Sequence, residues 1–246
     1  MKILVTNDDG IQKEGLKVLV KALKELGHDV STVAPAQEQS AVSSSLTLRK
    51  GISCEKINDV VPKVETYQVE GTPVDCVKAA IHILNIDFDL LISGVNNGYN
   101  LGEDIIYSGT VAAAKEAVIY DKKSIAISCE VGSLEGFNKI FKKLFCDIIK
   151  SDIYKESQML NINIPSNPKD VKITHQGWCK YNTNYDLKDG KYFAIGKPNF
   201  SNDRNDVNSD IYQIMHNNVS VTPVTIDVTD LSLIHISEPT RRRGIS

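Results

Sequence analysis

Apolar and polar positions along the first 35 residues follow the pattern of a strand, a helix and a second strand. Lys2–Thr6 is a short apolar and β-branched run, which is typical of a buried strand. Glu14–Leu26 predicts a helix with one apolar face, ended by Gly27, because its apolar residues recur every three or four positions (Leu16, Leu19, Val20, Leu23 and Leu26). Asp29–Ala34 is again strand-like. The unit therefore predicts two parallel strands joined by a right-handed crossover.

The same alternation continues through the middle of the chain. The pattern predicts further helices over Pro73–Leu84 (capped by Thr72), Gly109–Tyr120 and Gly136–Lys150. It predicts further strands over Asp89–Ser93, Ser124–Ser128 and Leu160–Ile164. Alternating strands and helices indicate an α/β fold with a Rossmann-like, doubly wound and mostly parallel sheet, in which ligands bind beyond the carboxyl ends of the strands.

From about Val171 the pattern becomes polar and aromatic. The Asp189-Gly190 pair within Gly177–Ile195 predicts the turn of a β-hairpin. A polar linker is expected over Ser201–Ser209, followed by strands over Ile211–Met215 and Val219–Val224. We therefore expect one domain over residues 1–230, with a core of about 1–170 and a projecting C-terminal hairpin extension of about 171–230.

The last residues, Leu231–Ser246, have a different character. They resemble the translation of a sequencing-library transposon adapter, so we interpret them as read-through that replaces the genuine C-terminus. A natural basic tail is the alternative. In the first case the segment that normally follows Asp230 is missing.

Composition narrows the class of protein. With 41% hydrophobic and 24% charged residues and a net charge of -3, the chain has the composition of a soluble protein and lacks the basic excess of proteins that bind nucleic-acid polymers. No apolar run approaches the roughly 20 residues that a membrane span needs, and no leader precedes the first strand, so a cytoplasmic protein is expected. The 5 cysteines are scattered without C-x-x-C spacing, which argues against a zinc site.

Candidate chemistry begins with Asp8 and Asp9, which end the first strand. Two neighbouring carboxylates repel each other, and burying both costs several kcal/mol unless a cation lies between them. The pair is therefore interpreted first as a metal site. The alternative is a turn followed by a helix cap, which Asp9-Gly10 would also support.

Two more oxygen-rich segments follow predicted parallel strands, so the sheet should bring them to the same edge as Asp8 and Asp9. These are residues 34–45 and residues 93–102. Carboxylates, hydroxyls and amide carbonyls are hard ligands that suit Mg²⁺, Mn²⁺ or Ca²⁺. The start of the next helix, Ser108-Gly109-Thr110, presents amides and hydroxyls to an anion, although the same residues are also a common cap. A metal beside an anion site suggests phosphate chemistry.

Five ordered motifs carry a resemblance to a known family. They are Leu4-Val5-Thr6-Asn7-Asp8-Asp9-Gly10-Ile11, Val33-Ala34-Pro35 with Glu38-Gln39-Ser40, Gly71-Thr72-Pro73-Val74-Asp75-Cys76-Val77, Ser93-Gly94-Val95-Asn96-Asn97-Gly98, and Tyr107-Ser108-Gly109-Thr110-Val111-Ala112-Ala113. In this order they resemble the SurE survival-protein family of metal-dependent 5′/3′-nucleotidases. The resemblance runs from Met1 to about Asp230, and it departs from the family pattern at residues 12–15 and in the hairpin.

The resemblance implies a Rossmann-like domain with a hairpin extension, a cytoplasmic location and a homodimer or tetramer, which the altered C-terminus would weaken. The implied metal ligands are Asp8, Asp9, Ser40 and Asn96, for one Mg²⁺ or Mn²⁺ ion per subunit. The implied phosphate contacts are Asn96, Ser108, Gly109 and Thr110, and the implied catalytic residues are Asp8, Asp9 and Asn96.

The sequence thus predicts an enzyme that hydrolyses nucleoside 5′-monophosphates, with 3′-monophosphates as an open question, to nucleoside and phosphate. Two alternatives stay open at this point. One is a phosphatase in which Asp8 itself forms an aspartyl phosphate, and the other is a nucleotide-sensing or anion-binding module without turnover.

Overall fold

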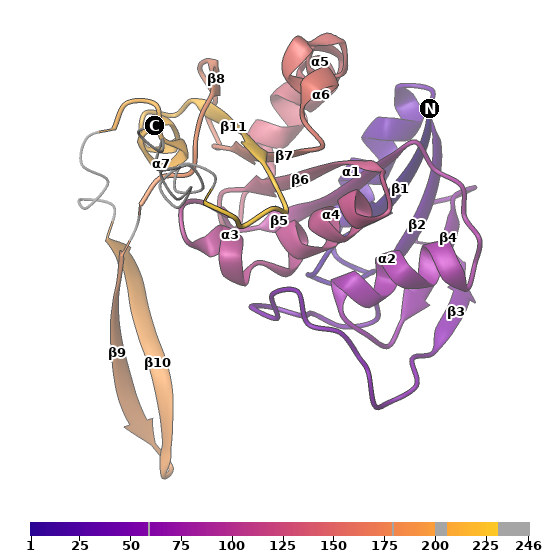
Figure 1. Cartoon of the computed structure of the whole chain (residues 1–246), viewed down its shortest axis with the longest axis horizontal. Helices are drawn as coiled ribbons and strands as arrows, with labels where there is room; N and C mark the ends of the chain where they lie inside the picture. The colour runs from indigo at the N-terminus through magenta and orange to yellow at the C-terminus, as the bar shows by residue number, and fades with distance from the viewer. Residues whose placement is uncertain (59, 179, 200–205, 231–246) are drawn as a thin grey trace, which may run out of the picture.

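The computed structural model describes residues 1–58, 60–178, 180–199 and 206–230, which form one large sheet, flanking helices and a separate hairpin (Figure 1). The strands of the large sheet are β1 (Lys2–Thr6), β2 (Asp29–Pro35), β3 (Cys54–Ile57), β4 (Glu65–Val69), β5 (Leu90–Asn97), β6 (Lys123–Cys129), β7 (Met159–Ile164), β8 (Val171–Ile173) and β11 (Val219–Val224). The hairpin consists of β9 (Lys180–Lys188) and β10 (Lys191–Asn199). The helices are α1 (Glu14–Glu25), α2 (Pro73–His82), α3 (Asp104–Tyr107), α4 (Gly109–Ile119), α5 (Glu135–Lys150), α6 (Asp152–Glu156) and α7 (Asp210–Met215).

The order of strands in the sheet is β3-β4-β2-β1-β5-β6-β7-β11-β8. Neighbouring strands from β4 to β7 pair in parallel, and so do β11 and β8. At the two ends of this parallel region, β3 runs antiparallel to β4 and β11 runs antiparallel to β7. This confirms the predicted Rossmann-like, mostly parallel α/β fold. Because β1 lies between β2 and β5, the carboxyl ends of these three strands meet at one edge.

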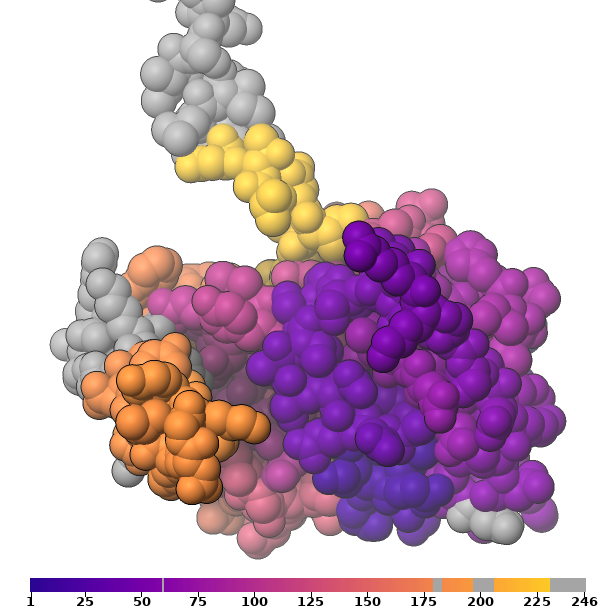
Figure 2. Space-filling view, turned by 90° about the horizontal axis from the view of Figure 1, so that it is seen from below, coloured from indigo at the N-terminus to yellow at the C-terminus, as the bar shows by residue number. Residues whose placement is uncertain are grey.

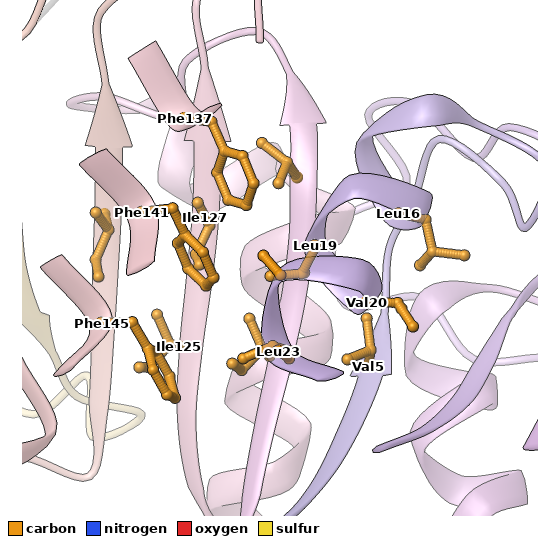
Figure 3. Packing of buried hydrophobic residues seen from close by; sticks show 14 of the residues in the cluster. Val5, Leu16, Leu19, Val20, Leu23, Ile125, Ile127, Phe137, Phe141 and Phe145 are labelled. Carbon is orange, nitrogen blue, oxygen red and sulfur yellow. The ribbon is translucent and has the colours of Figure 1, made fainter. Parts of the chain in front are cut away.

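Helices cover both faces of the sheet and bury an apolar core on each. On one face, the phenylalanines of α5 (Phe137, Phe141 and Phe145) pack over Ile125 and Ile127 of β6 and face Leu19 and Leu23 of α1 (Figure 3). On the other face, α2 and α4 pack their alanines and valines against β1, β5 and β6. Burying each large apolar side chain contributes about 1.5–3 kcal/mol, so the two layers hold the sheet rigid beneath its carboxyl edge.

One predicted strand is wrong. Residues 211–215 belong to helix α7, not to a strand. The Ser209 hydroxyl caps this helix by accepting the Tyr212 amide at 3.0 Å, and the buried side chains Ile211 and Ile214 lie three positions apart. In a run of only five residues, a spacing of three and an alternating pattern are hard to tell apart.

The predicted hairpin is confirmed. Lys188 pairs with Lys191, and Asp189 and Gly190, which form the turn, have φ angles of 50° and 72°, as a two-residue hairpin turn requires. The hairpin projects away from the sheet as a separate arm (Figure 1), which Figure 2 shows end-on. It exposes a set of apolar side chains (Tyr185, Leu187, Tyr192, Phe193 and Ile195). Most of the predicted linker and all of the predicted adapter tail lie outside the described residues.

Two further expectations concern membranes and thiols. Among the described residues, no helix has the combination of length and apolar character that crossing a bilayer requires. Cys54, Cys76, Cys129 and Cys146 are free thiols, of which Cys76 and Cys129 are buried. Cys179 lies outside the described residues.

Candidate functional site

A cavity of about 590 Å³ opens where the carboxyl ends of β1, β2 and β5 meet. The predicted metal ligands Asp8, Asp9, Ser40 and Asn96 all line it, as does Ser108 at the start of α4. Three segments that are up to 88 residues apart in the chain are thus brought to one place by the parallel order of the strands. The expectation that these residues share one edge is confirmed, while their individual roles stay predictions.

Local hydrogen bonds fix the first loop at the end of β1. The Asn7 side chain closes a turn by donating to the Gly10 carbonyl at 2.9 Å and accepting the Gly10 amide at 3.3 Å. The Asp8 carbonyl accepts the Gln39 amide at 2.8 Å, which ties this loop to the one after β2. The turn that was the alternative to a metal site is therefore present. It holds Asp8 and Asp9 at the cavity, so the turn and metal binding are compatible.

Asp8 is the most buried acidic group on the cavity wall, with an exposed fraction of 6%. The Thr110 hydroxyl donates to its Oδ1, and the Thr110 amide also contacts the carboxylate. Burial raises the pKa of Asp8 to about 6, although the Thr110 hydrogen bond acts in the opposite direction. The negative charge of Asp8 is therefore held in the protein at a cost.

Gly109 allows helix α4 to begin directly against Asp8. A Cβ atom at this position would lie 3.0 Å from the Asp8 Cβ and 3.2 Å from Pro73 Cγ. Any side chain here would push the first turn of α4 away from the carboxylate. The Ser-Gly-Thr motif thus supplies a cap, a close approach and a hydrogen-bond donor at successive positions.

Asp9 lies beside Asp8 at the mouth of the same cavity. Its Oδ2 accepts the Asn97 amide at 3.1 Å, so β5 holds one oxygen of the carboxylate. Burial raises the pKa of Asp9, while the Asn97 hydrogen bond lowers it and the charge of Glu38 raises it further. Both adjacent carboxylates therefore have raised pKa values, which is the electrostatic situation that a bound cation would relieve.

Ser40 lies in the loop after β2, and its hydroxyl donates to Glu38 Oε1 at 2.8 Å. Glu38 Oε2 in turn accepts from Lys13 Nζ at 3.0 Å. These hydrogen bonds to Lys13 and Ser40 lower the pKa of Glu38. The same loop is anchored further along by Ser43, whose amide and hydroxyl donate to the Tyr107 and Ile106 carbonyls at 3.0 and 2.8 Å.

Asn96 lies on a strand, whereas the sequence predicts it in the loop after that strand. The predicted strand ends at Ser93, whereas β5 continues to Asn97, with a register shift against β6 between Ser93 and Asn96. Asn96 thus lies on the strand end and not in a loop. Its Nδ2 donates to the Gly98 carbonyl at 2.8 Å, which leaves Oδ1 as the atom that can face a ligand.

The predicted phosphate contacts at the start of α4 have structural roles. Ser108 Oγ accepts the Val111 amide at 3.1 Å and caps the helix, so the capping alternative is present. Ser108 also reaches the cavity wall, whereas Gly109 and Thr110 are buried against Asp8. Contact of these three residues with a phosphate stays a prediction.

Several residues of the wall were missed by the sequence analysis. The acidic side chains Glu14, Glu38, Asp104 and Glu130 line the cavity, and Lys13 is the basic residue among the described side chains on its wall. Tyr99, and Tyr107 of the fifth motif, which the sequence offers as candidates for stacking against a base, also line it. Glu38 lies inside the second motif and Glu130 directly follows β6, so motif membership and the parallel strand order could have indicated these two positions.

A buried network supports the wall from β7. The Asn100 carbonyl accepts Nδ2 of both Asn161 and Asn163, at 2.9 and 3.1 Å, and the Asn100 amide donates to Asn163 Oδ1 at 2.8 Å. The Asn100 side chain donates to Ser128 Oγ at 2.9 Å. Polar residues inside the apolar strand β7 therefore hold the segment that follows Asn96, a role that the strand pattern alone does not show.

The donor set fits a hard divalent cation. Among the described residues, no three His, Cys, Asp or Glu side chains come together, so a metal here needs the neutral oxygens of Ser40 and Asn96 beside the two carboxylates. Two carboxylates, a hydroxyl and an amide carbonyl are oxygen ligands of the kind that Mg²⁺ and Mn²⁺ accept. In each of the four side chains a hydrogen bond to the protein already fixes one polar atom.

Comparison with known proteins identifies the relatives of this chain. The family model described as survival protein SurE matches residues 3–183. The chain belongs to the SurE family. It is 37% identical over 242 residues to the 5′-nucleotidase SurE of Alkaliphilus metalliredigens, covering 93% of this chain and 94% of the relative. It is 33% identical over 260 residues to the 5′-nucleotidase SurE of Synechocystis, with 98% and 94% covered.

A solved structure of a SurE protein has the same fold. The crystal structure of the SurE protein from Aquifex aeolicus superposes with a TM-score of 0.79 at 32% identity, covering 96% of this chain and 98% of that one. The superposition covers nearly the whole length of both chains, so it includes the large sheet and the hairpin region of this protein. The resemblance inferred from the five motifs is therefore confirmed.

Proposed function

We propose that this SurE-family chain is a metal-dependent 5′-nucleotidase that hydrolyses nucleoside 5′-monophosphates to nucleoside and phosphate. The observation that carries the proposal is the gathering of Asp8, Asp9, Ser40 and Asn96 on one cavity wall beside the start of α4. The names of the relatives, 5′-nucleotidase SurE, support the same reaction. Whether 3′-monophosphates are also substrates is left to the assay.

Asp8, Asp9, Ser40 and Asn96 would hold one Mg²⁺ or Mn²⁺ ion per subunit. When bound, such an ion polarises a phosphoryl oxygen and lowers the pKa of a coordinated water. The rigid hydrogen bonds behind each side chain would keep the four oxygens in place before the substrate arrives. Ser108 and the first turn of α4 would orient the phosphate, because a helix N-terminus favours negative charge.

Asp9 is the candidate for orienting the attacking water. It is less buried than Asp8, lines the open cavity, and has one oxygen fixed by the Asn97 amide, which leaves the other for a water molecule. Asn96 would face the developing charge on the phosphoryl oxygens. In phosphoryl transfer, such positioning and electrostatic stabilisation account for most of the catalysis.

The exposed apolar side chains of the hairpin support assembly into a homodimer or tetramer, since a monomer would leave them in water. A cytoplasmic location belongs to the same proposal and is supported by the free thiols of the described cysteines.

The test is phosphate release across a panel of nucleoside 5′- and 3′-monophosphates with Mg²⁺, with Mn²⁺ and with chelator. We expect turnover with added metal, abolished by chelator. Replacing Asp9 with Asn should lower the rate by several orders of magnitude, whereas Asp121→Asn in a surface turn should leave it unchanged. Nucleotide binding without phosphate release would instead identify a sensing module, and a trapped phospho-aspartate at Asp8 would identify the covalent mechanism.

A further inference from the structure

We propose that Glu38 and Lys13 are positioning residues that orient the Ser40 hydroxyl toward the metal ion, so that metal affinity depends on two side chains outside the predicted ligand set. This inference rests on the proposed function. Lys13 belongs to the segment 12–15, which the resemblance to the family does not include, whereas Glu38 and Ser40 belong to its second motif.

The three side chains form a continuous chain of hydrogen bonds along the cavity wall. Lys13 Nζ donates to Glu38 Oε2 at 3.0 Å, and Ser40 Oγ donates to Glu38 Oε1 at 2.8 Å. Glu38 thus uses both of its oxygens, one for each partner. All three residues line the cavity that holds Asp8 and Asp9.

A serine hydroxyl can serve as a neutral metal ligand only through its oxygen lone pairs, and its proton must point elsewhere. Glu38 takes that proton as a hydrogen-bond acceptor, which turns the lone pairs of Ser40 away from Glu38 and makes them available to a cation. Without Glu38, the hydroxyl would rotate freely or donate to another acceptor such as the nearby carboxylates. This is the role that a hydrogen-bond partner behind a metal ligand commonly has.

The backbone around Ser40 is already fixed, so the hydroxyl rotamer is the remaining freedom. The Gln39 amide donates to the Asp8 carbonyl at 2.8 Å, and the Ser43 amide donates to the Tyr107 carbonyl at 3.0 Å. Anchors on both sides of Ser40 hold its Cα between β1 and α3. The side chain of Glu38, which is about half exposed, then needs Lys13 to hold it over Ser40.

A purely electrostatic role for Glu38 must be separated from this one, because any acidic side chain near the cavity attracts a cation. Glu14 provides a control for the general effect of an acidic side chain on the cavity wall, since it lines the same cavity and carries the same charge, whereas Glu38 also acts on Asp9. The Ser40→Ala variant also distinguishes an electrostatic role of Glu38 from a role through the Ser40 hydroxyl. If Glu38 acts through Ser40, its removal should have no further effect once the hydroxyl is gone.

The experiment is a double-mutant cycle on the full chain, with the dissociation constant of Mn²⁺ measured by isothermal titration calorimetry. We expect Glu38→Ala to weaken Mn²⁺ binding about 10-fold in the wild-type background and less than about 2-fold in the Ser40→Ala background. Lys13→Ala removes the support of Glu38 and also a positive charge that acts on Asp9, so its effect through Ser40 is the difference between the two backgrounds, where we expect a loss of about 3-fold that Lys13→Arg restores. Glu38→Gln, which keeps an acceptor for Ser40, should lose less than Glu38→Ala.

Equal losses for Glu38→Ala in the two backgrounds, or an equal loss for Glu14→Ala, would show that Glu38 acts by charge or as a ligand and would overturn the proposal. Unchanged binding by Glu38→Ala would overturn it as well. Failure of the wild-type chain to bind Mn²⁺ would be a different result, since it would overturn the proposed function and this inference together. The residues concerned are exposed, so unfolding curves of the variants should match the wild type.

Discussion

Replacing Asp8 with Asn should stabilise the metal-free protein while abolishing its function. Asp8 lies at the end of β1 with an exposed fraction of 6%, against the first turn of α4. Asn has nearly the same shape, and its carbonyl oxygen can still accept the Thr110 hydroxyl that now contacts Asp8 Oδ1. The substitution therefore removes the buried charge and keeps the shape of the side chain, although its single acceptor oxygen must serve both the hydroxyl and the amide of Thr110, so the energies below are upper limits.

The magnitude follows from the pKa of Asp8, which burial raises from 3.8 to about 6. A raised pKa in an acid means that the folded state binds the proton more tightly than the unfolded state, so stability falls as the pH rises from 4 through 6. At about 1.4 kcal/mol per pH unit, the ionised carboxylate costs about 3 kcal/mol above pH 7. The cost shrinks to about 1.5 kcal/mol at pH 5 and to about 0.5 kcal/mol at pH 4.

The assay is urea-induced unfolding of both proteins in the presence of chelator at these three pH values. Asp8→Asn should be more stable than the wild type by up to these amounts, and the difference should vanish toward low pH. Saturating Mn²⁺ should reverse the order by stabilising the wild type alone, because a ligand that binds only the folded state adds to its stability.

A metal-free Asp8→Asn variant that is no more stable than the wild type at pH 7.5 would refute the reasoning, since it would show that the carboxylate is not strained by burial. A stability gain independent of pH would refute it in another way, because the gain would then arise from packing.

Three further predictions concern contacts around the site and the core. Thr110→Val removes the hydroxyl that donates to Asp8 and should weaken Mn²⁺ binding about 10-fold or more at pH 7 in calorimetry, whereas Thr110→Ser should not. Gly15→Ala places a Cβ atom 2.2 Å from the Val95 carbonyl oxygen and should cost about 2 kcal/mol in urea unfolding; an equal loss for Gly51→Ala, which has open space around it, would contradict this. Lys78→Met leaves Glu116, with a side-chain exposed fraction of 9%, without the ammonium at 2.9 Å and should cost about 2–3 kcal/mol, against about 0.5 kcal/mol for Lys139→Met in an exposed pair.

The parts of the fold that could be predicted are those in which a long periodic pattern meets a clear end signal. Helix α5, with its phenylalanines four positions apart, and the Asp189-Gly190 turn are such cases. The strands β3 and β8 at the two edges of the sheet, and β4 next to β3, are not predicted by the sequence because they are short and partly exposed, so their apolar pattern is weak. Residues 211–215 predict a strand where helix α7 forms, because five residues are too few to separate a helical spacing from an alternation.

The position of the candidate ligands could be predicted because parallel strands end at one edge, which places Asp8, Ser40 and Asn96 together whatever the details of the loops. The hydrogen-bond partners of these side chains could not be predicted from the sequence. The bond from Ser40 to Glu38 depends on a rotamer, and the support of Asn100 by Asn163 joins residues 63 positions apart. Such contacts follow from tertiary geometry and leave no periodic trace in the sequence.

The central claim is that Asp8, Asp9, Ser40 and Asn96 hold one divalent ion in the cavity at the carboxyl edge of the sheet. Its most direct test is an anomalous difference map from crystals of the full chain grown with Mn²⁺. We predict a single strong peak per subunit within about 2.0–2.5 Å of oxygens from these side chains. A map without a peak at this position, from crystals in which Mn²⁺ is shown to be present, would contradict the account.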